Sequence, residues 1–285
     1  MSKLEVKPEN HKIFIFKKIF DSEAAKQQAE KKKLNAFGLW KFNLLKRPQE
    51  DTVVLKQHIL RYEPFWFVAS KRTVNYTCLT TYSVPIYNRY ASSVTIKNDV
   101  YEDRKYPAIH QNERSHIELD VVENCHRSIE YSAYWDGLKR EMRSTVFENY
   151  IRKFIYHEVD RVDLENVLEP LLSLDYLTGV VRSELNRETI SASHIQEDLE
   201  EISSLFLYFR PVYAFEYYWA IGDKTGIIEV DGLTGEVAEN GSWFKDSFEQ
   251  AFTKQNLIEL SAELASTVVP GGGTAVRVAS KLMNQ

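Results

Sequence analysis

A regular alternation of residue types over residues 74–86 constrains the fold more than any other feature of the sequence. The even positions read Val, Tyr, Cys, Thr, Tyr, Val and Ile, whereas all odd positions but one carry polar side chains or proline. A period of two places successive side chains on opposite faces of a β-strand. Similar alternation returns in residues 94–96, 117–121 and 129–135. We therefore predict that residues 53–135 form an antiparallel sheet with one buried face.

Helical patterns flank this predicted sheet. Asp21 can cap a helix that begins directly after it, and an apolar stripe predicts a second helix over residues 144–155. Ser193 and Gln196 fit a capping box, which predicts a further helix over residues 193–206. The apolar residues at helical spacing in this last segment are Ile195, Leu199, Ile202 and Phe206.

The last part of the chain combines a β-meander with a terminal helix. Residues 210–220 read as an aromatic strand, and a glycine-containing turn joins them to a partner strand at 227–230. Apolar rows then predict a helix from Phe244 to Val268, which must stop at Pro270 and the three glycines that follow.

The segment Gly226–Val237 closes the meander with an Asp-Gly and a Thr-Gly pair. It resembles the strand-turn-strand ending of PepSY-type domains, in which an Asp and a Thr-Gly pair close the final hairpin. The resemblance covers about a dozen of 285 residues and implies this local hairpin alone. The residues themselves predict a tight turn, with glycines at the positions that can take a positive φ.

Two short segments share one arrangement of aromatic residues around a proline, namely residues 62–68 (YEPFWFV) and 209–215 (FRPVYAF). Because proline donates no ladder hydrogen bond, we expect it at the start of a strand or on a sheet edge. The shared pattern raises the alternative of two related α+β units. We expect an α+β protein with antiparallel β-meanders packed with helices. Its expected parts are a strand-helix segment with a β-rich unit (1–140), a helical segment (141–205), and a β-meander with a terminal helix (206–285).

Composition and charge argue against several classes of function. The chain has 44% hydrophobic and 27% charged residues, as soluble globular proteins do, and its longest apolar runs of five residues are far short of the ~20 that cross a bilayer. A net charge of −5 gives no basic field for nucleic acid. Two cysteines, Cys78 and Cys125, are too few for a disulfide framework, and residues 1–20 lack an apolar signal segment. We therefore expect a cytoplasmic protein.

The sequence carries no motif that identifies catalytic chemistry. It contains no nucleophile elbow, no zinc-protease motif and no dinucleotide-binding fingerprint. Cys125 and His126 are adjacent, and adjacent residues of a strand point to opposite faces, so they cannot activate each other. We expect neither a cofactor nor a metal ion.

Charge is separated along the chain in a way that favours association. Residues 1–50 carry 12 Lys+Arg against 6 Asp+Glu, whereas residues 158–204 carry 3 against 12. Such a separation steers association, although the two segments can also neutralise each other within one monomer. We expect a structural or adaptor subunit of a cytoplasmic assembly, which contacts a protein partner or a second copy of itself. The candidate contact residues are Lys31, Lys32, Lys33, Phe248 and Phe252.

Three alternatives remain open. The first is a ligand- or peptide-binding module, because aromatic residues anchor binding sites as well as cores. Its candidate pocket residues are Tyr62, Trp66, Tyr213 and Trp219. The second is an enzyme whose site lacks a recognisable motif. The third is peripheral membrane attachment through the terminal helix.

Overall fold

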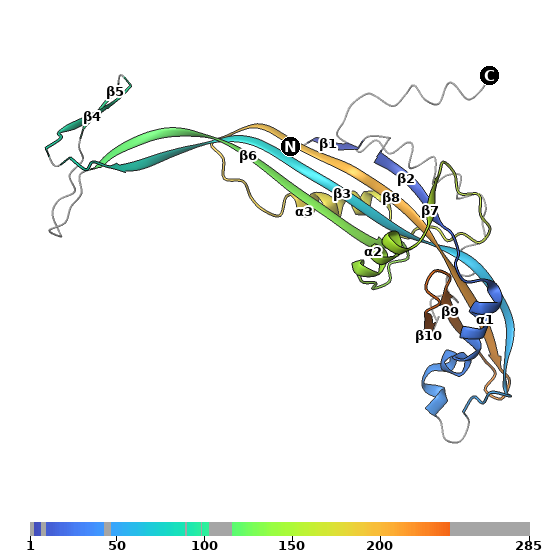
Figure 1. The fold of residues 1–285 in the computed structure, drawn as a ribbon. Coiled ribbons are helices and arrows are strands. Elements are labelled where there is room, and N and C mark those ends of the chain that lie inside the picture. Colours follow the sequence, from blue (N-terminus) through green and yellow to red (C-terminus); the bar gives the residue numbers. More distant parts are fainter. Residues whose placement is uncertain are drawn as a thin grey trace, which may run out of the picture.

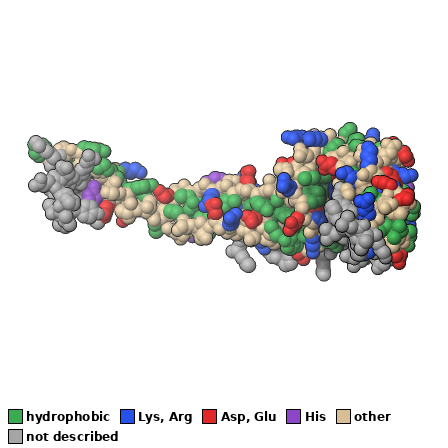
Figure 2. Space-filling model, turned by 90° about the horizontal axis from the view of Figure 1, so that it is seen from below, with side chains coloured by type: hydrophobic (Ala, Val, Ile, Leu, Met, Phe, Trp, Pro, Cys, Tyr) green, Lys and Arg blue, Asp and Glu red, His purple; other side chains and the backbone are tan. Residues whose placement is uncertain are grey.

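The fold is seen in a computed structural model, which describes residues 3–6, 10–42, 47–88, 90–97, 99–102 and 116–239. The predicted terminal helix, with Phe248 and Phe252, lies outside these residues. A long, curved ribbon of three strands extends from a bulkier body that contains the helices (Figure 1). We call the outer part of this ribbon, residues 74–85, 116–127 and 194–198, the arm, and the bulkier body the head. Figure 2 shows the narrow arm and the broad head from another side.

In order along the chain, the elements are β1 (Lys3–Val6), β2 (His11–Phe16), α1 (Ser22–Glu30), the 3-10 helix η2 (Lys33–Phe42), β3 (Val53–Pro85), β4 (Ser93–Ile96), β5 (Asp99–Glu102), β6 (His116–Asp136), α2 (Ser144–Lys153), β7 (Tyr156–Val159), α3 (Leu174–Leu185), β8 (His194–Trp219), β9 (Lys224–Asp231) and β10 (Val237–Glu239). The chain begins in the head, runs out along the arm in β3, returns to the head in β6, and runs back from the arm to the head in β8.

The main sheet is organised around β3, which pairs antiparallel with β6 on one side and with β8 on the other. On the far side of β8, β9 is antiparallel to it, whereas β1 and β2 are parallel to it. β4 and β5 form a separate two-stranded hairpin at the end of the arm (Figure 1). The expected α+β class with mostly antiparallel strands is confirmed.

Most of the local predictions before residue 160 hold. Asp21 caps α1, since its carboxylate accepts a hydrogen bond of 2.8 Å from the amide of Ala24. The stripe over residues 144–155 corresponds to α2. In β6 the even positions from Asp120 to Ser132 are exposed and the odd positions are half-buried, as expected of a sheet with one buried face.

The helix predicted over residues 193–206 is wrong, because this segment is the first half of β8. Ser193 caps no helix; its hydroxyl accepts a hydrogen bond of 2.8 Å from the amide of Leu79. Ile195 is 47% exposed, whereas Ile202 is fully buried and pairs with Ser70 of β3. The spacing of the apolar residues alone is compatible with a helix or a strand. The segment forms a strand because it pairs with β3 over its whole length. β8 also runs straight across residue 205, where we expected one part of the chain to end.

The two proline-containing segments lie side by side in one sheet. Tyr62 is paired with Pro211, and Pro64 with Phe209. β6 pairs with β3 only from Phe65 onward, and β9 pairs with β8 only from residue 212 onward. Both prolines therefore stand where a neighbouring strand ends and no ladder bond needs their missing N–H. The alternative of two related units finds no support in this arrangement.

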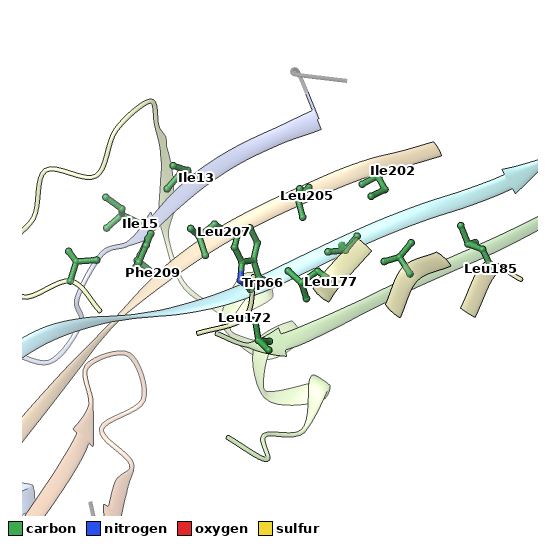
Figure 3. Packing of buried hydrophobic residues seen from close by; sticks show 13 residues of the cluster. Ile13, Ile15, Trp66, Leu172, Leu177, Leu185, Ile202, Leu205, Leu207 and Phe209 are labelled. Carbon is green, nitrogen blue, oxygen red and sulfur yellow. The ribbon is translucent and has the colours of Figure 1, made fainter. Parts of the chain in front are cut away.

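Helices cover both faces of the sheet within the head. On one face, Leu177, Val181 and Leu185 of α3 pack against Trp66 and Leu205 in the largest apolar cluster (Figure 3). These α3 residues recur every four positions and so lie on one stripe of the helix. On other surfaces of the sheet, α2 and α1 with η2 bury clusters of their own. Beyond the end of α3, no described helix covers the arm, so its side chains are held by the three strands and their connecting loops.

Candidate functional site

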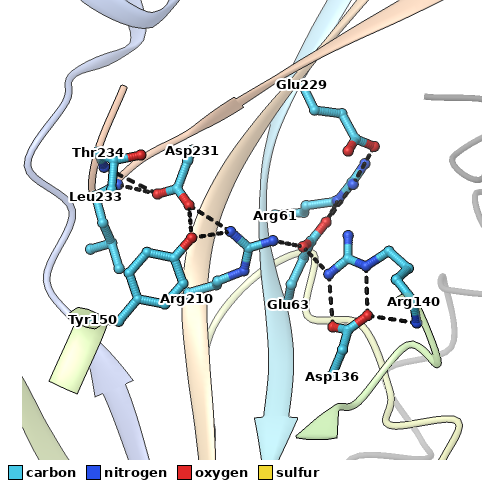
Figure 4. Close-up of polar contacts among 10 residues, drawn as sticks. All are labelled: Arg61, Glu63, Asp136, Arg140, Tyr150, Arg210, Glu229, Asp231, Leu233 and Thr234. Carbon is cyan, nitrogen blue, oxygen red and sulfur yellow. Dashed lines mark hydrogen bonds and ion pairs between the residues drawn. The ribbon is translucent and has the colours of Figure 1, made fainter. Parts of the chain in front are cut away.

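A network of charged side chains is buried in the head, at the inner end of β6 (Figure 4). It unites three arginines, four carboxylates and one tyrosine: Arg61, Arg140, Arg210, Glu63, Asp136, Glu229, Asp231 and Tyr150. These residues come from β3, β6, β8, β9, α2 and the loop after β6. The network therefore links the three strands of the ribbon to β9 and α2.

Glu63 lies at the centre of this network, and its side chain is 0% exposed. Arg61 Nε donates to one carboxylate oxygen at 2.9 Å. Arg140 and Arg210 each donate an Nη2 hydrogen bond to the other oxygen, at 2.8 and 2.7 Å. Arg61 also donates to Glu229 at 2.6 Å. Charge-assisted hydrogen bonds of this kind offset the cost of burying the ions.

A second branch of the network holds the β9–β10 turn. Arg210 Nη1 donates to Asp231 at 2.6 Å, and the hydroxyl of Tyr150 donates to the same carboxylate oxygen. The other oxygen of Asp231 accepts hydrogen bonds from the amides of Leu233 (2.7 Å) and Thr234 (3.2 Å). The tight turn predicted from the sequence is present, and Asp231 connects it to β8 and α2.

The environment of Glu63 makes it a weak base. Burial by itself would raise the pKa of Glu63, but the positive charges of Arg61, Arg210 and Arg140 hold it well below its usual range. Burial raises the pKa of Tyr150 above its usual range, and the neighbouring Asp231 acts in the same direction. A general acid or base works best with a pKa near the working pH. The network is thus suited to holding structure rather than to transferring protons.

A pocket of about 580 Å³ opens next to the network, at the end of β6. Asp136 and Arg140 belong to both the network and the pocket wall. The backbone of Lys139, at the pocket, has a φ of 61°, in the left-handed region that residues other than glycine rarely adopt. The other lining residues are aromatic, apolar or polar: Tyr134, Trp135, Tyr176, Met142, Leu171, Leu172, Glu141 and Ser173.

The four aromatic residues proposed for a binding pocket are divided between two cores. Trp66 is buried and Tyr62 half-buried in the cluster beneath α3. Tyr213 and Trp219 are buried in the cluster beneath α1 and η2. The structure does not bring the four together, and none of them lines the pocket beside Arg140.

The lysines proposed as contact residues lie on the head at the end of α1. Lys31 and Lys32 are exposed. Lys33 is engaged within the chain, since its ammonium group lies 3.1 Å from a carboxylate oxygen of Glu50 and 3.4 Å from one of Glu30. A described ion pair joins the basic and acidic segments, because Lys12 donates to Glu158 at 2.8 Å. Part of the charge separation is thus neutralised within the monomer.

Exposed apolar side chains gather toward the outer end of the arm. Leu79 is 72% exposed and lies opposite Val122, which is 57% exposed. We call the exposed apolar residues of this end the distal patch: Leu79, Tyr82, Val84, Tyr87, Tyr90 and Val122. Leu79 and Val122 are on one face of the ribbon and Tyr82 and Val84 on the other, so the patch exposes apolar side chains on both faces of the arm. Clustered apolar surface on a soluble protein commonly marks a contact site.

The two cysteines, which the sequence places far apart, are neighbours on one face of the arm. Tyr76 is opposite Cys125, and Cys78 is opposite Glu123, so Cys78 and Cys125 are diagonal neighbours on adjacent strands. Both thiols are free. Desolvation and the nearby Cys125 thiol raise the pKa of Cys78. Only the register between β3 and β6 brings these side chains together.

Metal-binding clusters and membrane-spanning helices were sought among the described residues. There, no three His, Cys, Asp or Glu side chains converge closely enough to hold a metal ion. Each helix in the same residues is too short or too polar to traverse a lipid bilayer.

Comparison with known proteins gave no relatives: no family model matches the chain, and no curated protein or solved structure matches it significantly.

Proposed function

We propose that this protein is a non-enzymatic structural or adaptor subunit that contacts a protein partner through the distal patch of its arm. The observation that carries the proposal is the position of this patch. Large apolar side chains such as Leu79 and Tyr87 are 72% and 86% exposed at the far end of the arm, away from the apolar clusters of the head. Burying such a side chain in an interface contributes about 1.5–3 kcal/mol.

The buried network supports the same proposal. Glu63 and Arg210 are buried and opposite each other on β3 and β8, and the network around them joins these two strands, which continue into the arm, to α2 and β9. Firm attachment of these strands within the head limits the orientations of the distal patch, which lowers the entropic cost of binding. The low pKa of Glu63 does not support acid-base catalysis in the network.

We propose the cytoplasm as the setting of this contact. The chain has only two cysteines, Cys78 and Cys125, which are too few for a disulfide framework. Oxidising compartments favour disulfides, whereas the cytoplasm keeps thiols reduced.

The test removes two large side chains of the patch without disturbing the core. Leu79→Ser combined with Tyr87→Ser changes two residues of the patch that are 72% and 86% exposed, and Ile155→Ser combined with Ile221→Ser changes two residues of the head that are 69% and 60% exposed. Each tagged full-length variant is purified from the native cells, and its co-purifying proteins are quantified by mass spectrometry. We expect the arm variant to lose a partner that the wild type and the head variant retain. Equal recovery of all partners by both variants would refute the proposal.

The pocket beside Arg140 favours a second candidate, a ligand- or peptide-binding module. Trp135 and Tyr176 provide aromatic surface there, and Lys139 provides a positive charge. A ligand would protect these side chains from solvent. The test is a thermal-shift screen of the wild type and of Trp135→Ala, in which a specific ligand stabilises the wild type alone; the absence of any such ligand argues against this candidate.

A further inference from the structure

β6 is a long, regular edge strand that carries charged side chains but lacks the other features that protect an edge, namely a bulge, a proline or a lysine. Among the described residues it pairs with β3 alone, and its register from Phe65–Asp136 to Pro85–His116 contains no bulge. Its sequence contains no proline, lysine or glycine. Every second residue of such a strand directs its N–H and C=O groups away from the sheet, where another strand can bind them.

The other edges of the same sheet are short, covered or irregular. β1, β2 and β9 cover the outer side of β8 along residues 199–219, and the edge strands β1, β7 and β10 have only three or four residues each. The edge of β3 before Phe65 carries a bulge at Lys56 and ends in Pro64. A bulge, a lysine and a proline each discourage the pairing of a further strand. Among the described strands, β6 therefore offers the longest regular edge at which this sheet can be extended.

We propose that β6 pairs antiparallel with β6 of a second copy of this chain, around a two-fold axis that passes through Cys125. Such an axis is perpendicular to the sheet, so it keeps each face on its own side. Cys125 then lies opposite Cys125 of the second copy. A residue a given number of positions before Cys125 lies opposite the residue of the second copy that is the same number of positions after it. The result is a continuous six-stranded sheet with three strands from each copy.

This register matches charge on the half-buried face. It places Glu123 opposite Arg127 of the second copy, and the reverse by symmetry. Within one chain Arg127 also donates to Glu188, and Glu123 accepts from the Tyr82 hydroxyl, so the new contacts would extend these pairs. A register centred on residue 123 or 127 would instead place two like charges at the centre, which is destabilising. On the exposed face, Asp120 would lie opposite Glu130, where water and salt screen their repulsion.

The same register matches apolar side chains. Val121 would lie opposite Ile129 of the second copy, and Leu119 opposite Tyr131. All four side chains are half-buried in one chain, so pairing would remove more of their apolar surface from water. The pairing over residues 119–131 would extend about 40 Å, at roughly 3.3 Å per residue.

The first experiment uses Cys125 as a probe of the two-fold axis. In the proposed dimer the two Cys125 residues are directly opposite, at a Cα separation of about 4.5–5.5 Å that permits a disulfide. The oxidant diamide is added to form this disulfide. It accepts two electrons and two protons as the two thiols join. The variant Cys78→Ser removes the neighbouring thiol that would compete within one chain, and Cys125→Ser is the matched control. We expect Cys78→Ser to give a covalent dimer of twice 33.2 kDa on a non-reducing gel, and Cys125→Ser to remain single. Absence of the dimer in Cys78→Ser, or an equal dimer in both variants, would overturn the proposed register.

The second experiment needs no cysteine chemistry and measures the dissociation constant by sedimentation. Arg127→Glu places two acidic residues opposite each other, and we expect it to weaken the dimer by about tenfold or more. The double variant Glu123→Arg/Arg127→Glu reverses both charges and should restore dimerisation to within about threefold of the wild type. A wild-type chain that is monomeric at all concentrations, or a double variant as weak as the single one, would overturn the proposal.

These outcomes are separable from those of the proposed function. Arg127→Glu should retain the partner that binds the distal patch, whereas Leu79→Ser with Tyr87→Ser, both outside the paired residues 119–131, should retain the dimer. A monomeric wild type that still recovers its partner refutes the dimer alone. A dimer whose distal patch can be removed without loss of any partner refutes the adaptor function alone.

Discussion

Glu63 of β3 lies directly opposite Arg210 of β8, and the Arg210 guanidinium donates a hydrogen bond of 2.7 Å to the Glu63 carboxylate. Both side chains are at least nine-tenths buried. Replacing Glu63 by glutamine leaves the arginines around it without their shared negative charge. We expect Glu63→Gln to lower the free energy of unfolding by about 3–5 kcal/mol, measured by urea denaturation.

The matched control for this variant is an exposed ion pair in the same molecule. Lys12 and Glu158 are 37% and 50% exposed and 2.8 Å apart. Because water screens such a pair, Glu158→Gln should cost less than about 1 kcal/mol. Equal losses in the two variants would show that burial of the network does not determine its contribution.

Stability should depend on pH through the same carboxylate. The pKa of Glu63 in the folded protein is lowered from its usual value of 4.5, so unfolding raises it and the unfolded chain binds a proton more readily. The stability that Glu63 contributes is therefore complete above about pH 4.5 and declines as the pH falls further. We expect the unfolding free energy of the wild type to fall more steeply below pH 4.5 than that of Glu63→Gln, by up to about 1.4 kcal/mol per pH unit. Parallel pH profiles for the two proteins would contradict the lowered pKa.

We expect substitution by alanine to have opposite effects on stability at two glycines, Gly235 and Gly179. Gly235 has a φ of +74°, and a Cβ there would come 2.4 Å from the ring of Phe20, so Gly235→Ala should destabilise by more than about 1 kcal/mol. Gly179 is inside α3 with nothing within 4 Å of an added Cβ, so Gly179→Ala should stabilise by about 0.5–1 kcal/mol. Thermal unfolding of the two variants tests both signs, and a change of the same sign in both would be inconsistent with this backbone.

Residues 195 and 202 distinguish the observed strand from the helix that their spacing predicts. Ile202 is fully buried, and Ile202→Ala should cost about 2–4 kcal/mol. Ile195 is 47% exposed on the arm, and Ile195→Ala should change stability by less than about 1 kcal/mol. On a single helical stripe the two residues would be buried alike, so equal losses would argue for the helix.

Local patterns predicted the elements whose partners are close in the sequence. The alternation over residues 74–86 predicted part of β3, and Asp21 predicted the start of α1. The segment 193–206 was misassigned because its apolar residues satisfy a period near four, while the strand depends on pairing with β3, more than a hundred residues earlier. No local signal reports such a distant partner.

The candidate sites also differ in how far the sequence could predict them. The exposed residues of the distal patch lie in a segment recognised from the sequence as a strand, but their exposure depends on the absence of a covering helix among the described residues. The buried network gave no sequence signal at all, because Arg61, Asp136 and Arg210 lie far apart in the sequence. Charged residues in strands are ordinarily taken to face solvent.

The amino-acid sequence by itself determined the α+β class, the alternating strands, the capped first helix and the turn at Asp231, since each depends on neighbours a few residues away. Only the tertiary structure decided that β3 has two partners, that residues 194–219 are one strand, and that Cys78 lies beside Cys125. The reason is physical: pairing register and the satisfaction of buried charge depend on which distant segments meet, and those contacts form together or not at all.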